Sequence, residues 1–166
     1  MNTVKTTKLY NVMFPIWLLW LFPLTWIVIL PGNFIIDLLV VVLTMKHLKV
    51  EDVKGRARAV IFKVWIMGFV ADFIGCVGMF FFNLVEVKWI TNEFISALNY
   101  NPFEHLGALL WTTFCVIVTG LIIYRLNYSW CLKKAELAEL ERKKVALAMA
   151  VFTAPYMFYL PTEWFR

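Results

Sequence analysis

Charged residues and catalytic motifs are both scarce in this chain. Only 16% of its 166 residues are Asp, Glu, Lys or Arg, whereas soluble domains average about a quarter. The sequence contains no H-E-x-x-H, no phosphate-binding glycine loop, no G-x-S-x-G and no C-x-x-C. The chain therefore lacks the usual signatures of zinc proteases, nucleotide-binding proteins, serine hydrolases and thiol redox enzymes. We predict a protein that is not an enzyme and that carries no cofactor.

Cysteine and histidine are also few. Two of the three cysteines, Cys76 and Cys115, fall within expected helices, and Cys131 falls on the expected cytoplasmic side. This distribution indicates no disulfide framework. His47 and His105 are expected on opposite sides of a membrane, where they cannot share a metal ion. We therefore predict no metal site.

Long hydrophobic runs are abundant, since 62% of the residues are hydrophobic. A bilayer core about 30 Å thick requires about 20 mainly apolar residues per helix. The sequence predicts an all-α, polytopic transmembrane helix bundle that forms a single domain over residues 1–166. The expected spans are residues 13–30, 34–48, 59–84 and 103–124, with a short fifth at 145–160 that contains Pro155.

The first two runs are separated by Leu30-Pro31-Gly32-Asn33, a sequence typical of a turn. We therefore expect residues 13–48 to form a helical hairpin, which either crosses the membrane twice or stops within it and returns. In both arrangements the two ends of the hairpin lie on the same side. The start of the fourth span is marked by Asn101 as a cap and Pro102 at the first helical position.

The basic residues are strongly sided under this arrangement. Every Lys and Arg except Lys88 and Arg166 falls on the face that carries the amino terminus and the loops after the second and fourth spans. The positive-inside rule then places the amino terminus and both basic loops in the cytoplasm, and suggests the plasma membrane. A net charge of +5 on such a chain indicates contact with anionic lipid rather than with nucleic acid.

Small residues mark the helix faces that are expected to pack together. Gly68, Ala71, Gly75 and Gly78 share about one third of the third helix, and bulky apolar residues occupy the rest. A bundle this small has little interior, so these faces are candidates for contact within a homo-oligomer or with other membrane subunits.

Two acidic residues within the spans are the strongest chemical signal. Asp72 is expected near the membrane midplane and Asp37 about one turn below the outer surface. A charged side chain at the bilayer centre costs about 3 kcal/mol, so it is expected to be paired, hydrated or protonated. One interpretation is a proton or cation site. The other is a neutral, hydrogen-bonded Asp that joins helices. The candidate intramembrane polar site comprises Asp37, Asp72, Asn33, Thr112 and Thr119.

Three functions remain open. The first is a non-catalytic membrane subunit or interaction protein, in which a cytoplasmic helix at residues 132–144, continuous with the fifth span, binds a cytoplasmic protein partner. The second is a small oligomeric transporter or channel, coupled to protons or cations, that uses Asp37 and Asp72. The third is a membrane enzyme acting on a lipid or a quinone near Glu86, Glu104 and His105.

Overall fold

Helices account for all the regular structure in the part of the chain that the computed structural model describes, residues 23–85 and 90–161. The all-helical prediction is confirmed for these ranges. The α-helices are α1 (Pro23–His47), α2 (Val53–Leu84), α3 (Asn92–Tyr100), α4 (Leu106–Leu126) and α5 (Glu139–Phe152). Short 3-10 or π turns follow several of them, at η2 (Pro102–Glu104), η3 (Asn127–Cys131), η4 (Leu132–Ala135) and η5 (Tyr156–Tyr159).

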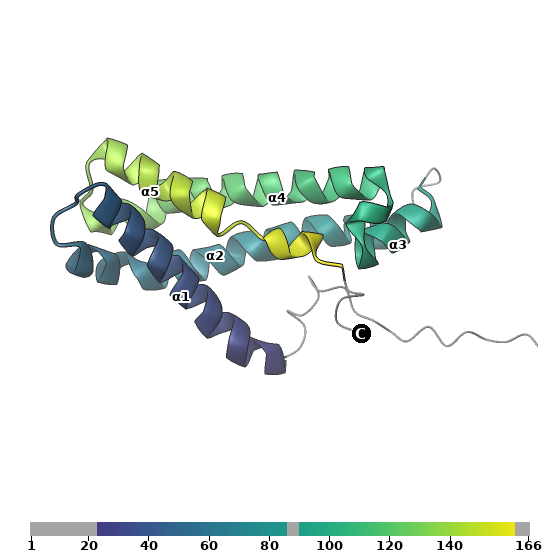
Figure 1. Ribbon diagram of the computed structural model, residues 1–166, viewed down its shortest axis with the longest axis horizontal. Coiled ribbons are helices and arrows are strands. Elements are labelled where there is room, and N and C mark those ends of the chain that lie inside the picture. Colours follow the sequence, from purple (N-terminus) through teal and green to yellow (C-terminus); the bar gives the residue numbers. More distant parts are fainter. Residues whose placement is uncertain (1–22, 86–89, 162–166) are drawn as a thin grey trace, which may run out of the picture.

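The helices α2 and α4 run side by side along the molecule, and α1 crosses α2 obliquely (Figure 1). The shorter α5 packs against α1 and α4 near the end where α1 finishes, and α3 packs against α4 at the opposite end. The chain then continues from α5 along the bundle through η5, drawn in yellow in Figure 1. As a result, α5 covers only part of the length of α4.

Three helices in the described ranges are long and apolar enough to cross a membrane, at Trp26–His47, Val53–Leu84 and Leu106–Ala135. Their outward side chains are large and apolar. Ile27 of α1, Phe73 of α2 and Leu121 of α4 are 71%, 60% and 63% exposed. Such a surface suits lipid, because exposed apolar patches of this extent are rare on soluble monomers.

The expected hairpin in residues 13–48 is wrong within the described residues. The helix α1 continues through Pro31, Gly32 and Asn33 without a turn. Proline lacks an N–H and so interrupts one helical hydrogen bond. A turn at this position would leave several backbone N–H and C=O groups unpaired in an apolar medium, which costs more free energy than the loss of one bond. A side chain from α2 supports the same region, since Trp65 Nε1 donates to the Leu30 carbonyl oxygen at 3.0 Å.

This continuous helix removes the argument that placed both ends of the segment on one side. Pro23 and His47 lie at opposite ends of α1. The cytoplasmic amino terminus therefore stays a prediction, and residues 13–22 of the first expected span lie outside the described residues.

The expected long helix through residues 132–160 is also wrong. The chain forms η4, adopts a left-handed conformation at Glu136 (φ 49°), and begins α5 only at Glu139. The helix α5 then ends at Phe152, before Pro155. Because Pro155 lacks an N–H and disfavours helical geometry in the residue before it, the helix stops here. At 14 residues, α5 is about 21 Å long, too short to cross a bilayer core.

All the lysines and arginines in the described ranges gather at one end of the bundle, which we call the basic end. They come from the end of α1, the start of α2, the end of α4 with its following turns, and the start of α5 (Figure 1). The basic end comprises Lys46, Lys49, Lys54, Arg56, Arg58, Lys63, Arg125, Lys133, Lys134, Arg142, Lys143 and Lys144. The sidedness of charge expected for these residues thus appears as a property of the fold.

A candidate polar site between α1, α2 and the chain after α5

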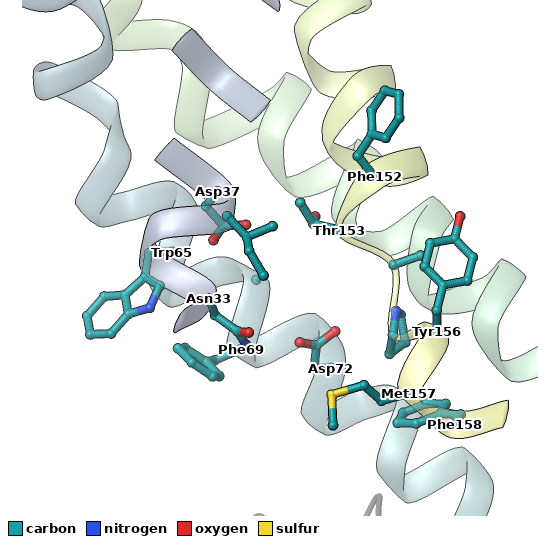
Figure 2. Close-up of a pocket in the computed structure, with 14 residues that line it drawn as sticks. Asn33, Asp37, Trp65, Phe69, Asp72, Phe152, Thr153, Tyr156, Met157 and Phe158 are labelled. Carbon is teal, nitrogen blue, oxygen red and sulfur yellow. The ribbon is translucent and has the colours of Figure 1, made fainter. Parts of the chain in front are cut away.

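A cavity of about 250 Å³ lies between α1, α2 and residues 152–158. Figure 2 shows the carboxyl groups of Asp37 and Asp72 facing this space from α1 and α2. Asn33 of α1 and Thr153 of the segment after α5 add an amide and a hydroxyl to its lining. Since a water molecule occupies about 30 Å³ in the liquid, the cavity has room for several waters or for a hydrated ion.

Asp37 is the more buried of the two acids, with 6% of its surface exposed. It approaches α2 at Gly68, where an added Cβ would lie 3.6 Å from Asp37 Oδ2. Gly68 precedes Asp72 by about one helical turn, so the two acids lie at neighbouring levels of the bundle. The sequence placed Asp37 near the outer surface, but the unbroken α1 puts it near the middle of a 25-residue helix.

Asp72 carries a buried oxygen atom, Oδ1, that has no hydrogen-bond partner among the described residues. A polar group left in this state costs about 1–3 kcal/mol, and more when it is charged. The cavity lining contains no Lys, Arg or His within the described ranges. The positive charges of the same ranges lie at the basic end instead. Within residues 23–85 and 90–161, no basic side chain lines the cavity to neutralise the two carboxyl groups.

The structure brings together three of the five residues of the expected polar site and leaves two elsewhere. Asn33, Asp37 and Asp72 line the cavity. Thr119 is buried in α4, where its hydroxyl donates to the Cys115 carbonyl oxygen at 2.8 Å. Thr112 is also buried in α4, and its Oγ1 has no partner among the described residues. Neither threonine lines the cavity.

If Asp72 joined helices through hydrogen bonds, the sequence would offer Asn83, a Trp N–H, Thr112 or Thr119 as partners, and the structure places these groups in other surroundings. The Asn83 side chain pairs with the Asn99 amide through two hydrogen bonds of 2.9 and 3.2 Å. Trp111 Nε1 donates to the Gly78 carbonyl oxygen at 3.1 Å. These donors lie in other contacts, so the polar surroundings of Asp72 are those of the cavity.

The four small residues on α2 face different elements of the same chain. Gly68 faces Asp37 on α1, and Ala71 is fully buried. A Cβ on Gly75 would meet the Thr119 hydroxyl and the Phe158 ring, and one on Gly78 would lie 3.2 Å from Cys115 Sγ. Close approach of this kind is the usual role of small residues in membrane helices. The packing of α2 against its own neighbours thus uses this face.

Sequence reasoning missed the contribution of Tyr156, Met157 and Phe158 to the cavity. The sequence predicted a helix through residues 145–160, whereas the chain bends after Phe152 and brings the Phe158 ring next to Gly75 of α2 while η5 stays in contact with α4. Pro155 was the feature of the sequence that could have indicated this bend. At the bend, the Thr153 hydroxyl donates to the Met149 carbonyl oxygen at 2.7 Å and the Tyr156 N–H donates to the Ala154 carbonyl oxygen at 2.7 Å.

The residues proposed for an enzyme site take part in helix starts. Asn101 Nδ2 donates to Glu104 Oε1 at 3.0 Å, and the Asn101 side chain accepts from the Phe103 N–H. His105 Nδ1 accepts from the Gly107 N–H at 3.1 Å and caps α4. Glu86 lies outside the described residues. The described ranges contain no group of three His, Cys, Asp or Glu side chains able to hold a metal ion.

Comparison with protein-family models, curated proteins and solved structures gives no match for this chain. Its class is therefore defined by the fold and the site alone. The described residues form an all-helical protein with three membrane-length helices and an acid-lined cavity between two of them, α1 and α2, and residues 152–158.

Proposed function

We propose that this chain is a small membrane transporter or channel that binds a proton or a small cation at Asp37 and Asp72. The observation that carries the proposal is the buried Asp72 Oδ1, which has no partner among the described residues and lies on a cavity that a second acid also lines. Intramembrane carboxyl groups commonly mark proton or ion pathways, because their burial is costly and such residues are therefore rare where function does not require them.

Each residue has a distinct role in this proposal. Asp72 and Asp37 supply the negative charge that binds the proton or cation, and Asn33 and Thr153 supply neutral oxygen atoms around it. Hard cations prefer such oxygen ligands. The bend at residues 153–155 borders the same cavity and joins α5 to η5. We propose that movement at this bend opens the site to one side of the membrane.

The charge distribution supports an orientation for the pathway. With the basic end in the cytoplasm, as the positive-inside rule favours, α1 runs from outside at Pro23 to inside at His47. Asp37 then lies about 15 Å from the cytoplasmic end of α1, close to the bilayer midplane. A site at this depth is typical of transporters.

Flux measurements in liposomes test the proposal. The full chain, Asp72→Asn and Asp37→Asn are reconstituted, and entry of H⁺, Na⁺ and K⁺ is followed under an imposed gradient. We expect flux of one ion in the wild type and its loss in both variants. Glu93→Gln makes the same carboxyl-to-amide change at an exposed residue outside the cavity, and it should transport normally. Size exclusion must show the same folded species for all four proteins.

A second readout separates binding from transport. Carbodiimides react with protonated carboxyl groups in apolar surroundings, so we expect wild-type protein to gain an adduct at Asp72 or Asp37. If the site binds a cation, that cation should slow the reaction by displacing the proton. If it binds only a proton, added cations should have no effect and the reaction should slow only as pH rises. Flux that persists in Asp72→Asn and Asp37→Asn would contradict the assigned roles of these residues.

A subunit or interaction protein is the second candidate function. Leu140 at the start of α5 is 63% exposed although it lies among the charged residues of the basic end. An apolar side chain in that position favours contact with a protein partner or with another copy of the chain. Absence of flux for every ion, with site-specific crosslinking from residue 140 to a second polypeptide, would support this function over transport.

A further inference from the structure

A groove lies between α4 and α5, and it shares Ala154 and Tyr156 with the lining of the acid-lined cavity. It has a volume of about 610 Å³, and we call it the α4–α5 groove. Its walls are apolar side chains that face outward, among them Ile117 and Leu121 of α4 and Leu147 and Val151 of α5, which are 49–63% exposed. Gly120 and Ala150 form its floor, where an added Cβ on Gly120 would lie 3.4 Å from the Ala150 carbonyl oxygen.

The two ends of the groove differ in chemistry. Lys143, Lys144 and Tyr124 line the end that belongs to the basic end of the bundle. Tyr156 and Tyr159 line the other end, and their hydroxyls already donate to the Val151 carbonyl oxygen at 2.6 Å and to Thr113 Oγ1 at 2.9 Å. With those hydroxyls satisfied, the distant end presents ring surfaces. The groove is therefore cationic at one end and apolar along the rest.

The lysines are placed to receive an anion. Lys143 Nζ pairs with Glu139 at 2.7 Å, whereas Lys144 makes no ion pair with any residue in the described ranges. Nearby, the Arg142 guanidinium lies 4.7 Å from the Tyr128 ring, which stacks on Tyr124. This arrangement keeps positive charge at the mouth of the groove at the level expected for lipid headgroups.

We propose that the α4–α5 groove binds one anionic phospholipid, with an acyl chain along the groove and the phosphate at Lys144 and Lys143. The length fits this occupant. Eight residues of α5 separate Lys144 from Phe152, about 12 Å, and the groove continues beyond them to Ala154, Tyr156 and Tyr159, so its length is comparable to the hydrocarbon depth of one leaflet. The charge fits as well. Every anionic lipid carries its charge at the headgroup level, where Lys143 and Lys144 lie, whereas a helix from a second protein would need an acidic residue at that one position.

The test uses the full chain in nanodiscs that contain equal amounts of phosphatidylglycerol and phosphatidylcholine, followed by native mass spectrometry of the lipid it retains. We expect wild type to retain phosphatidylglycerol in preference to phosphatidylcholine. Lys144→Gln leaves the Glu139–Lys143 pair intact and should reduce that preference roughly fivefold, and Lys143→Gln with Lys144→Gln should reduce it by the same factor again.

A matched control separates this site from general attraction to the membrane surface. Lys133→Gln with Lys134→Gln removes the same charge from two adjacent, exposed lysines of the basic end that do not line the groove. It should leave the preference unchanged. Leu147→Trp fills the groove from an exposed position and keeps both lysines, and it should release the retained lipid.

Two results would overturn the proposal. An equal loss of preference in the two double-lysine variants would mean surface electrostatics without a site. Retention that does not respond to Leu147→Trp would mean that the acyl chain lies elsewhere. Because Asp72→Asn leaves the groove intact, its lipid retention should match wild type whether or not the protein transports an ion.

Discussion

Arg56 and Lys63 at the basic end differ from Asp72 in the cavity in the hydrogen-bond partners that the described residues give them. At the basic end, Arg56 Nη1 donates to the carbonyl oxygens of Ala135 and Glu136 at 2.7 and 2.5 Å, and Lys63 Nζ donates to that of Trp130 at 3.1 Å. In the cavity, Asp72 Oδ1 has no such partner among the described residues. Only the first arrangement is explained by stability.

The difference follows from where helices end. The last carbonyl oxygens of a helix lack N–H partners and carry partial negative charge, so cations near them are stabilised. The turns η3 and η4 after α4 supply such oxygens to Arg56 and Lys63. Asp37 and Asp72 lie in the interior of α1 and α2, where helical hydrogen bonds already use the backbone N–H groups. An acid there depends on other side chains, water, a proton or a cation for its partner.

The largest effect is expected at Arg56. Arg56→Ala removes two charge-assisted hydrogen bonds that join the start of α2 to the turns before α5, and we expect a loss of about 3 kcal/mol in the free energy of unfolding. Denaturant unfolding in detergent micelles measures it. Arg58→Ala removes the same kind of side chain from an exposed position two residues away and should change stability little. Equal losses of stability in Arg56→Ala and Arg58→Ala would contradict the role given to the hydrogen bonds of Arg56.

The next effect tests the packing of α2 beside the cavity. Gly75→Ala brings a methyl group against the Thr119 hydroxyl and the Phe158 ring, and we expect a loss of about 2 kcal/mol by overpacking. At Gly68 the added methyl meets only Asp37 Oδ2 at 3.6 Å, an ordinary contact distance. Gly68→Ala should therefore be neutral or slightly stabilising. Thermal unfolding of both variants and of wild type measures the effect. A Gly68→Ala variant less stable than Gly75→Ala would contradict this prediction.

Substitution of Asp72 in the cavity should raise the stability of the protein, whereas most substitutions of buried residues lower it. Asp72→Leu removes an unpaired polar oxygen and extends into the cavity, so we expect stability to rise by about 1 kcal/mol while ion flux is lost. Asp52 offers the contrast, because its carboxylate caps α2 by accepting from the Gly55 N–H at 3.2 Å. Asp52→Ala should lose about 1 kcal/mol. A large loss of stability in Asp72→Leu would show that Asp72 serves the fold.

The smallest effect is expected at the exposed Glu139–Lys143 pair. The hydrogen bond and charge of Lys143 lower the pKa of Glu139, and Glu139 in turn raises the pKa of Lys143. The contribution of Glu139 is therefore present above the ordinary glutamate range and is lost as pH falls through its lowered pKa. Glu139→Gln should give a barely measurable loss at neutral pH and none in acid. A difference from wild type that grows towards acid pH would contradict this sign.

The two prolines show why part of the site escaped prediction. Pro31 and Pro155 carry the same local signal, yet α1 continues through the first and α5 ends before the second. The sequence neighbourhood does not distinguish them. Pro31 lies where Trp65 of α2 supplies a donor to the adjacent Leu30 carbonyl oxygen, whereas Thr153 and Tyr156 form a turn around Pro155. A contact from a neighbouring helix supports the chain beside Pro31, whereas hydrogen bonds within the segment itself form the bend at Pro155.

The same limit applies to the candidate polar site. Asp37, Asp72 and Asn33 were recognisable because polar residues are rare in runs of apolar ones. Thr112 and Thr119 were grouped with them on helix faces alone, but α4 meets α2 at Gly75 and Gly78, away from the cavity. Which polar faces meet depends on how helices cross, and the spacing of residues along one helix carries no information on that.

The amino-acid sequence alone established the all-helical class, the helices around residues 59–84 and 103–124, and the separation of basic from apolar residues. An apolar medium demands these, since backbone groups there must pair within each helix and charges must stay near its ends. Tertiary packing determined that residues 23–47 form one helix, that α5 stops at Phe152, and that Asp37 and Asp72 face one cavity. The unbroken α1 and the shared cavity depend on contacts between residues far apart in the chain, which a local pattern does not encode, whereas the end of α5 follows a local proline whose effect differs from that of Pro31.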